Sequence, residues 1–175
     1  SGLQRLTSQV RKRFDRENTD IIDPYVNVRE DVVTAIGKLV RGGASMESRA
    51  NAARAAGILR GREAVPDLLK ALHSKDTNLI FESLIALQKI NDPKAGPGVV
   101  FLMRDLEERV QIAAIETAGL LRAKEAIPDL QRIYNREESD KVRRAALGGL
   151  AMVPEASSRP LFQKGFTDKD DGVRA

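Results

Sequence analysis

The chain has 175 residues, a formal net charge of +4, no cysteine and no tryptophan. The lack of cysteine excludes a disulfide scaffold and thiol chemistry, and the charge is weaker than the basic bias of proteins that bind nucleic acid mainly through phosphates. No apolar run approaches the roughly 20 residues that are needed to span a bilayer.

The N-terminal part is predicted to be a degenerate helix pair, residues 1–45, that caps the rest of the chain. Ser1-Gly2 is typical of an expression scar, so we expect a natural N-terminus with any targeting segment to have been removed. This leaves the compartment open, with the cytoplasm slightly favoured. An amphipathic helix is predicted over residues 28–41, with an antiparallel partner whose apolar residues are Leu3, Leu6, Val10 and Phe14.

A basic run lies in that first predicted helix. Arg11-Lys12-Arg13, with Arg16, could form a patch for nucleic acid or anionic lipid. Val10 and Phe14 in the same stretch make the helix amphipathic, and its polar side must carry charge. We therefore favour a solvated helix face.

A repeat is predicted over residues 46–175. Four prolines recur at intervals of 31, 31 and 32 residues, each 18 residues after the start of an alanine-rich run. A fixed period of this length is typical of stacked helix pairs, in which each unit covers the apolar face of its neighbour. The prolines are Pro66, Pro97, Pro128 and Pro160, and the runs start at Ser48, Leu79, Val110 and Val142.

Each unit is predicted to be a helix, a short turn and a second helix. Counted from the start of the run, positions 4, 5, 8 and 11 form one stripe of apolar or small residues on the first helix. The proline suits the first turn of the second helix, where its missing N–H has no partner. Positions 20 and 24 are expected to be buried; they are Leu68, Val99, Leu130 and Phe162, then Leu72, Met103, Tyr134 and Phe166.

Residues 171–175 predict the start of a fifth unit that ends after one turn. The chain is therefore expected to be cut from a longer array, with an uncovered apolar edge on its last full unit. That edge is a candidate for a crystal or oligomer contact. The sequence as a whole predicts an all-α fold, a right-handed α-α superhelix of antiparallel helix pairs.

Three segments resemble HEAT-like repeats of the phycobilisome-lyase type. They are Asp-Lys-Val-Arg-Arg-Ala-Ala-Leu from Asp140, Asp-Gly-Val-Arg-Ala from Asp171, and Ala-Ile-Pro-Asp-Leu at 126–130. The resemblance implies a HEAT-like solenoid whose second helices line the concave face and bind partners. It also implies two narrower activities: some members attach bilin pigments together with a partner chain, and distant relatives bind DNA.

A column of basic residues around one phenylalanine is the candidate binding site. Position 22 of each second helix points away from the buried side, and positions 25 and 26 follow one turn later. Stacked units should align these residues into a positive ridge, and an outward aromatic flanked by basic residues is typical of a binding hot spot. The seven candidates are Lys70, His73, Phe101, Arg104, Arg132, Arg136 and Lys164.

Each part of this ridge has a plainer explanation. The twist of the superhelix could tuck Phe101 against a neighbour or into a crystal or oligomer contact. Exposed lysine and arginine are also what helix surfaces ordinarily carry. Phe101 is therefore the sharper of the two observations.

No catalytic, metal or cofactor site is predicted. His73 is the one histidine of the chain, whereas a zinc or iron site needs several histidines, cysteines or clustered carboxylates at helical spacing. Paired acids such as Glu107-Glu108 and Glu137-Glu138 lie in turns or near helix starts, where they suit the helix dipole. The sequence favours a non-enzymatic scaffold for a protein or peptide partner. The alternatives are a bilin lyase-like subunit and a DNA-binding array, although the charge argues against nucleic acid.

Overall fold

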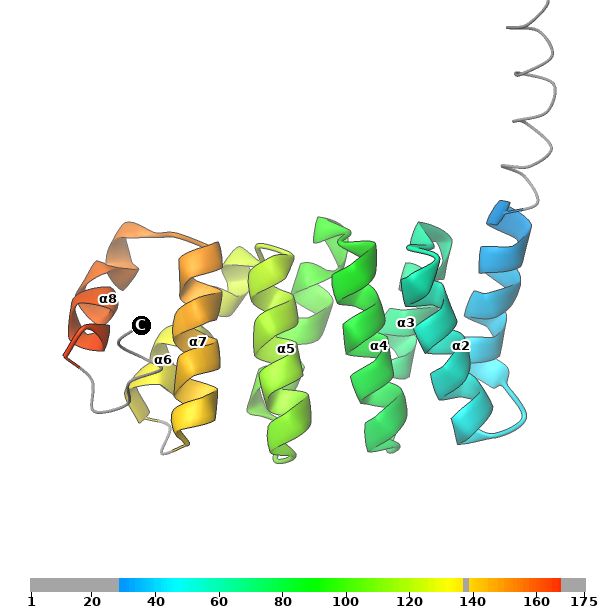
Figure 1. The fold of residues 1–175 in the computed structure, drawn as a ribbon, viewed down its shortest axis with the longest axis horizontal. Helices are drawn as coiled ribbons and strands as arrows, with labels where there is room; N and C mark the ends of the chain where they lie inside the picture. The colour runs from blue at the N-terminus through cyan, green and yellow to red at the C-terminus, as the bar shows by residue number, and fades with distance from the viewer. Residues whose placement is uncertain (1–28, 137–138, 168–175) are drawn as a thin grey trace, which may run out of the picture.

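The computed structural model describes residues 29–136 and 139–167. Regular structure within these residues is entirely helical. The helix pairs follow one another in a row, with the first helices in front and the second helices behind them in Figure 1. The predicted all-α solenoid is therefore confirmed.

The first helix of each unit begins two residues before the apolar run identified in the sequence. Polar caps explain two of these starts: the side chains of Ser45 and Asp76 accept hydrogen bonds from the backbone N–H groups of Ser48 and Leu79. The four first helices are α2 (Met46–Ile58), α4 (Thr77–Ile90), α5 (Glu108–Leu120) and α7 (Asp140–Met152).

The second helices follow after short connectors. They are α3 (Val65–Ala71), the 3-10 helix η2 (Pro93–Arg104), α6 (Ile127–Arg136) and α8 (Arg159–Gly165). Single 3-10 turns lead into three of them: η1 (Arg62–Ala64), η3 (Lys124–Ala126) and η4 (Ala156–Ser158). Pro66, Pro128 and Pro160 each occupy the second residue of a helix, as expected for a residue without an N–H.

The second unit departs from this plan. Its second helix begins at Pro93, so Pro97 lies inside the helix and not at its start. The helix is also a 3-10 helix over its whole length. Gly96 and Gly98 flank Pro97, and glycine and proline are the poorest formers of an α-helix. The expectation that Pro97 opens a second α-helix is therefore wrong.

A left-handed residue ends the first helix in three units. Arg60, Asn91 and Arg122, all at position 12 of their units, have φ angles of 51°, 54° and 54°. The N–H groups of Gly61 and Ala123 donate to carbonyls five residues back, the bond of a Schellman motif. Pro154 stands at position 12 of the fourth unit and its ring forbids a positive φ, so that turn differs.

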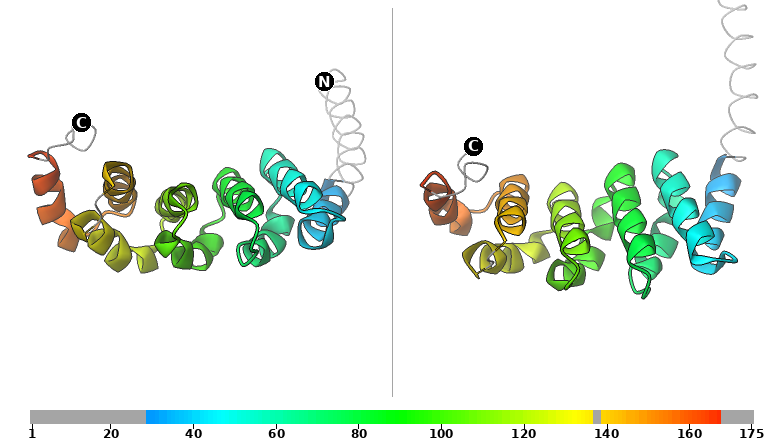
Figure 2. Two further views of the ribbon diagram at one scale, coloured as in Figure 1. Left: turned by 90° about the horizontal axis from the view of Figure 1, so that it is seen from below. Right: turned by 60° about the horizontal axis from the view of Figure 1, so that its bottom comes forward.

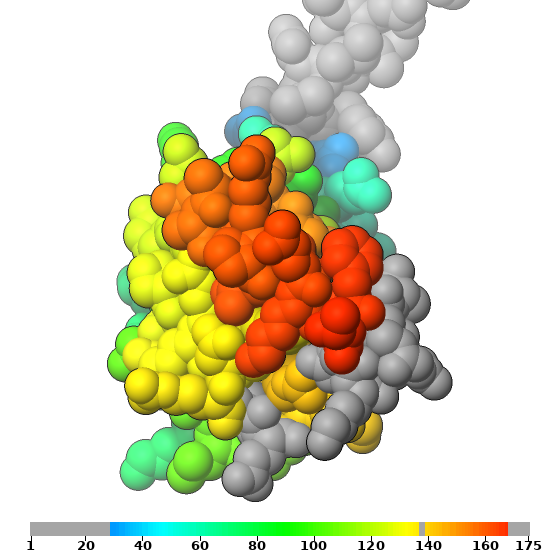
Figure 3. Space-filling model, turned by 90° about the vertical axis from the view of Figure 1, so that its left-hand side faces the viewer, coloured from blue at the N-terminus to red at the C-terminus, as the bar shows by residue number. Residues whose placement is uncertain are grey.

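The core follows the predicted positions in the first three units. All six residues at positions 20 and 24 of those units are at most 1% exposed. In the fourth unit Phe162 is half-buried, and Phe166, which was expected to be buried, is 73% exposed. α8 ends at Gly165 and is the last helix described, so no described element packs outside it. Figure 3 looks onto this end, where α7, η4 and α8 form the near surface in orange and red.

The row of helices curves gently, as the left view of Figure 2 shows. The first helices lie on its inner side and the second helices on its outer side. The expectation that second helices line the concave face is therefore wrong. Glycines explain the direction of the curve, because a Cβ on Gly57 would lie 2.8 Å from Ala86 Cα and one on Gly119 would lie 2.9 Å from Gly149 Cα. The backbones of neighbouring first helices thus approach closely, which shortens that side of the array.

A further helix, over residues 29–42, precedes α2. Arg29 donates to the carbonyl of Leu59 at 2.7 Å, and Arg49 of α2 donates to the carbonyl of Val40 at 2.8 Å. The apolar partner expected over residues 3–14 and the fifth unit expected at 171–175 lie outside the described residues. The division of the chain near residue 45 therefore stays a prediction.

The packing of the first helices gives a testable prediction. Ala114 is completely buried at position 4 of α5. Replacing it with leucine should lower the free energy of unfolding by about 1–3 kcal/mol, because the added carbons have no space. Chemical denaturation of the full chain measures this loss, with Ala35→Leu on an exposed helix face as the control. If Ala114→Leu is as stable as the control, position 4 does not face a neighbouring helix.

Candidate functional site

Six of the seven predicted site residues lie on the second helices, and His73 lies just after α3. All seven side chains are exposed, as the pattern of buried positions predicted. The structure brings most of them into contact between neighbouring units, but not as a row of free positive charges.

An aromatic stack joins the first two units. The rings of His73 and Phe101 are stacked with their centroids 4.6 Å apart and their planes 2° from parallel. His73 follows α3, while Phe101 lies on η2 between residues that are buried on the other side of the helix. Phe101 stays 45% exposed. The stack therefore presents a flat aromatic surface to solvent, with Lys70 one turn before His73.

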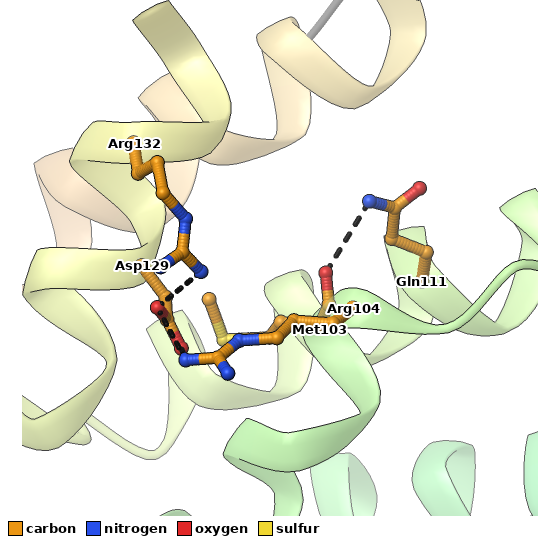
Figure 4. Close-up of polar contacts among 5 residues, drawn as sticks. All are labelled: Met103, Arg104, Gln111, Asp129 and Arg132. Carbon is orange, nitrogen blue, oxygen red and sulfur yellow. Dashed lines mark hydrogen bonds and ion pairs between the residues drawn. The ribbon is translucent and has the colours of Figure 1, made fainter. Parts of the chain in front are cut away.

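Arginine residues of the second and third units converge on one carboxylate (Figure 4). Arg104 donates to both oxygens of Asp129 at 2.9 and 3.0 Å, and Arg132 donates to Oδ1 of the same residue. The Asp129 side chain is 10% exposed, whereas those of Arg104 and Arg132 are 63% and 42% exposed. One negative charge thus sits between two of the predicted positive ones, and the ridge is less basic than its residue types indicate.

A hydrogen bond from α5 also holds the C-terminal end of η2, next to Arg104. Gln111 of α5 donates from Nε2 to the carbonyl of Met103 at 3.3 Å, as Figure 4 also shows. Met103 is fully buried. Arg104 therefore starts from a fixed backbone, which helps its Nη2 reach both oxygens of Asp129.

Asp129 was not predicted from the sequence, although a signal for it was present. Aspartate follows the proline in two units, at Asp67 and Asp129. Each meets an arginine of the neighbouring helix in the same layer. Arg41 of the helix over residues 29–42 lies 3.6 Å from Asp67, as Arg104 of η2 lies beside Asp129. This shared pairing gives the helix over 29–42 the place of a second helix.

The remaining candidates lie nearer the end of the array. Lys164 of α8 donates to Asn135 Oδ1 at 3.4 Å, and its Nζ lies 5.5 Å from the centroid of the Tyr134 ring. Arg136 is exposed at the end of α6. These two and Lys70 are the ridge residues that lie apart from both the stack and the Asp129 cluster.

Neither a metal centre nor a membrane span is found in the described part of the chain. No group of three or more histidine, cysteine or acidic residues there could hold a metal ion. Among the same residues, no helix has the length and apolar character needed to cross a bilayer. The surface features to explain are therefore the aromatic stack and the charges around it.

Comparisons with known proteins agree with this architecture. A family model described as HEAT repeats matches residues 97–175. The crystal structure of an engineered protein superposes with a TM-score of 0.62 at 21% identity, over 81% of this chain and 74% of that one. The complex of CpcE and CpcF of phycocyanin lyase from Nostoc sp. PCC7120 superposes with a TM-score of 0.56 at 23% identity, over 85% of this chain and 68% of that one. A comparison with curated protein sequences found no match.

Identities this low establish a shared fold, and a fold by itself does not specify a function. The repeat period, the paired helices and the family match all describe the same architecture. The chain therefore has the fold of HEAT-like repeat proteins, and the HEAT repeats family model matches its residues 97–175.

Proposed function

We propose that the chain is a non-enzymatic scaffold that binds a protein or peptide partner on the surface of its second helices. The observation that carries the proposal is the His73–Phe101 stack, because it keeps a large aromatic surface in solvent. Exposed aromatic groups held rigidly in place are typical centres of protein interfaces, since little side-chain freedom is lost on binding.

The surroundings of the stack indicate the chemistry of the partner. Lys70 precedes His73 by one helical turn, and Arg104 follows Phe101 by one turn on η2. Arg104 already shares the charge of Asp129, so Lys70 is the stronger attraction. A partner with an apolar or aromatic group next to an acidic one fits this surface.

A DNA-binding array has less support. Such an array needs several uncompensated cations for phosphates, and Asp129 compensates part of the charge of Arg104 and Arg132. Three lysine or arginine residues of the ridge, Lys70, Arg136 and Lys164, are left outside that cluster. Binding to a double-stranded oligonucleotide that weakens steeply with added salt would revive this alternative.

A bilin lyase-like role rests on the fold of the phycocyanin lyase complex alone. That complex contains two different chains, which agrees with a protein partner for the present one. No described residue adds support for pigment chemistry. Covalent attachment of bilin to an acceptor protein, dependent on this chain and a partner chain, would be the evidence for it.

The scaffold proposal is tested by replacing Phe101 with alanine. We expect the full 175-residue chain, immobilised as bait, to retain a specific partner, and the variant to bind it at least tenfold more weakly, a difference of about 1.4 kcal/mol. Leu106→Ala is the matched control, because Leu106 is a fully exposed apolar residue outside the stack.

Titration of the captured protein against both variants gives the comparison. Equal affinity for wild-type chain, Phe101→Ala and Leu106→Ala would rule out the stack as the binding centre. Equal loss in both variants would point to a general apolar effect rather than to this surface.

A further inference from the structure

A groove runs between α5 and α7, which stand side by side in Figure 1. It contains a hollow of about 580 Å³, whose lining includes Ile112, Ala145 and Met152. A second hollow, of about 590 Å³, shares Met152 and continues past the ends of both helices. Leu120 adds an exposed apolar side chain to this second part. The two hollows together form one trough with an apolar floor.

Glycines create the space. A Cβ built on the exposed Gly148 would meet no atom within 4 Å, so the absent side chain leaves the groove open. Beneath it, Gly119 and Gly149 bring the two backbones together, and Leu130 of α6 lies under Gly149. The floor is thus formed where the two helix backbones approach closely.

The corresponding groove between α2 and α4 is bridged by a salt bridge. Arg54 donates to both oxygens of Glu82, at 2.7 and 3.3 Å, and these hydrogen bonds raise the pKa of Arg54 above its ordinary value. In the α5–α7 pair the same two positions hold Glu116 and Ala145. Alanine cannot form the bridge, so the groove stays open at this interface.

The rim of the groove is mainly basic. Its charged lining residues are Lys141, Arg144, Arg122 and Lys124 on the positive side and Glu116 on the negative side. Lys141 of α7 lies 4.0 Å from Glu108 of α5, a long ion pair that a closer acidic residue of a partner could replace. An apolar floor with a basic rim complements a segment that is apolar on one side and acidic beside it.

We propose that this groove binds an amphipathic helix of a partner protein, with leucine-like residues on the floor and acidic residues against the basic rim. A helix is favoured over an extended segment because the described residues offer no strand edge to pair with its backbone. The apolar floor disfavours a nucleic acid, whose phosphates need charge alone. The groove lies on first helices, so this proposal is independent of the second-helix surface.

The probe is a synthetic peptide of about 18 residues, with leucine at positions i, i+3, i+4 and i+7 and glutamate on the remaining face. We expect saturable binding of the labelled peptide to the full chain by fluorescence anisotropy. Gly148→Leu should weaken it at least tenfold, because the new side chain fills the hollow. Gly42→Leu is the control, since a Cβ there also meets nothing within 4 Å and Gly42 ends the helix over 29–42. Thermal unfolding of both variants checks that they fold.

A charge reversal tests the rim. Lys124→Glu should weaken binding several-fold, and more at low salt than at high salt. Arg62→Glu is the matched control, because both residues are exposed, open a 3-10 turn and stand four residues before a proline. A peptide with lysine in place of glutamate should bind at least tenfold more weakly.

Several outcomes would overturn the proposal. One is an acidic peptide that binds more weakly than about 1 mM, and another is equal binding by Gly148→Leu and Gly42→Leu. Equal binding of the lysine and glutamate peptides would remove the role of the rim. Self-association of the chain in sedimentation experiments, abolished by Gly148→Leu, would show that a second copy occupies the groove instead.

Discussion

Replacing Leu130 with alanine should lower the free energy of unfolding by about 2–5 kcal/mol. Leu130 is completely buried in α6 and lies under Gly149 of α7, where a Cβ would be only 3.2 Å from its side chain. Removing its outer carbons leaves a cavity between two neighbouring helices. To close this cavity, α7 would have to move away from α5, against which its backbone is closely packed at Gly119 and Gly149.

Urea unfolding of the full chain, followed by circular dichroism, measures the loss. Phe101→Ala is the control: it removes a larger side chain, but one that is 45% exposed, and we expect a loss of less than about 1.5 kcal/mol from the broken stack. Equal destabilisation by both changes would show that the register of the second helices is wrong.

The loss should also be local. Units of a repeat array contact only their neighbours, so its stability is close to a sum over units and interfaces. In Leu130→Ala, amide hydrogen exchange should therefore accelerate more in α6 and α7 than in α2. Uniform acceleration along the chain would mean that the array unfolds as one unit, in which case the urea midpoint alone reports the effect.

Most of the fold could be predicted because a repeat presents the same physical problem several times. The prolines at three helix starts and the buried apolar residues at position 20 of the first three units obey local rules that do not depend on the neighbours. Pro97 does not open a helix, because the glycines on both sides of it disfavour an α-helix there. These glycines were visible in the sequence, but the prediction relied on the repeat period instead. The predicted burial of Phe166 was wrong for a different reason, because burial at this position depends on the neighbouring element and not on α8 itself.

The direction of curvature could not be predicted from periodicity. It depends on how closely neighbouring first helices approach, and therefore on which residue each glycine faces in another unit. Gly57 and Gly119 were visible in the sequence, but Ala86 and Gly149, the residues they face, are known only from the packing. The family resemblance pointed to the opposite face.

The candidate site was predicted in part. Exposure follows from helix geometry, so the outward direction of Lys70, Phe101 and the other ridge residues could be read from spacing. The contacts between units could not, because they depend on the offset from one helix to the next. That offset places His73 against Phe101 and turns Asp129 toward Arg104.

Replacing both Gly57 and Gly119 with alanine should destabilise the chain by about 2–6 kcal/mol, although alanine is the better helix former. Each new Cβ would lie less than 3.0 Å from a backbone atom of the next first helix, and overpacking of this kind costs about 1–3 kcal/mol per site. The sites lie in different interfaces, α2–α4 and α5–α7, so their costs should add.

The matched control is the double variant Gly42→Ala with Gly148→Ala. Neither new Cβ meets an atom within 4 Å, so the only effect is the gain in helix propensity, roughly 0.5–1 kcal/mol for each site in a helix interior and less at a helix end. Urea unfolding should therefore move in opposite directions for two variants of identical composition. A gain in stability in both would mean that close approach of the first helices is not what sets their spacing, and the explanation given for the curvature of the array would be lost with it.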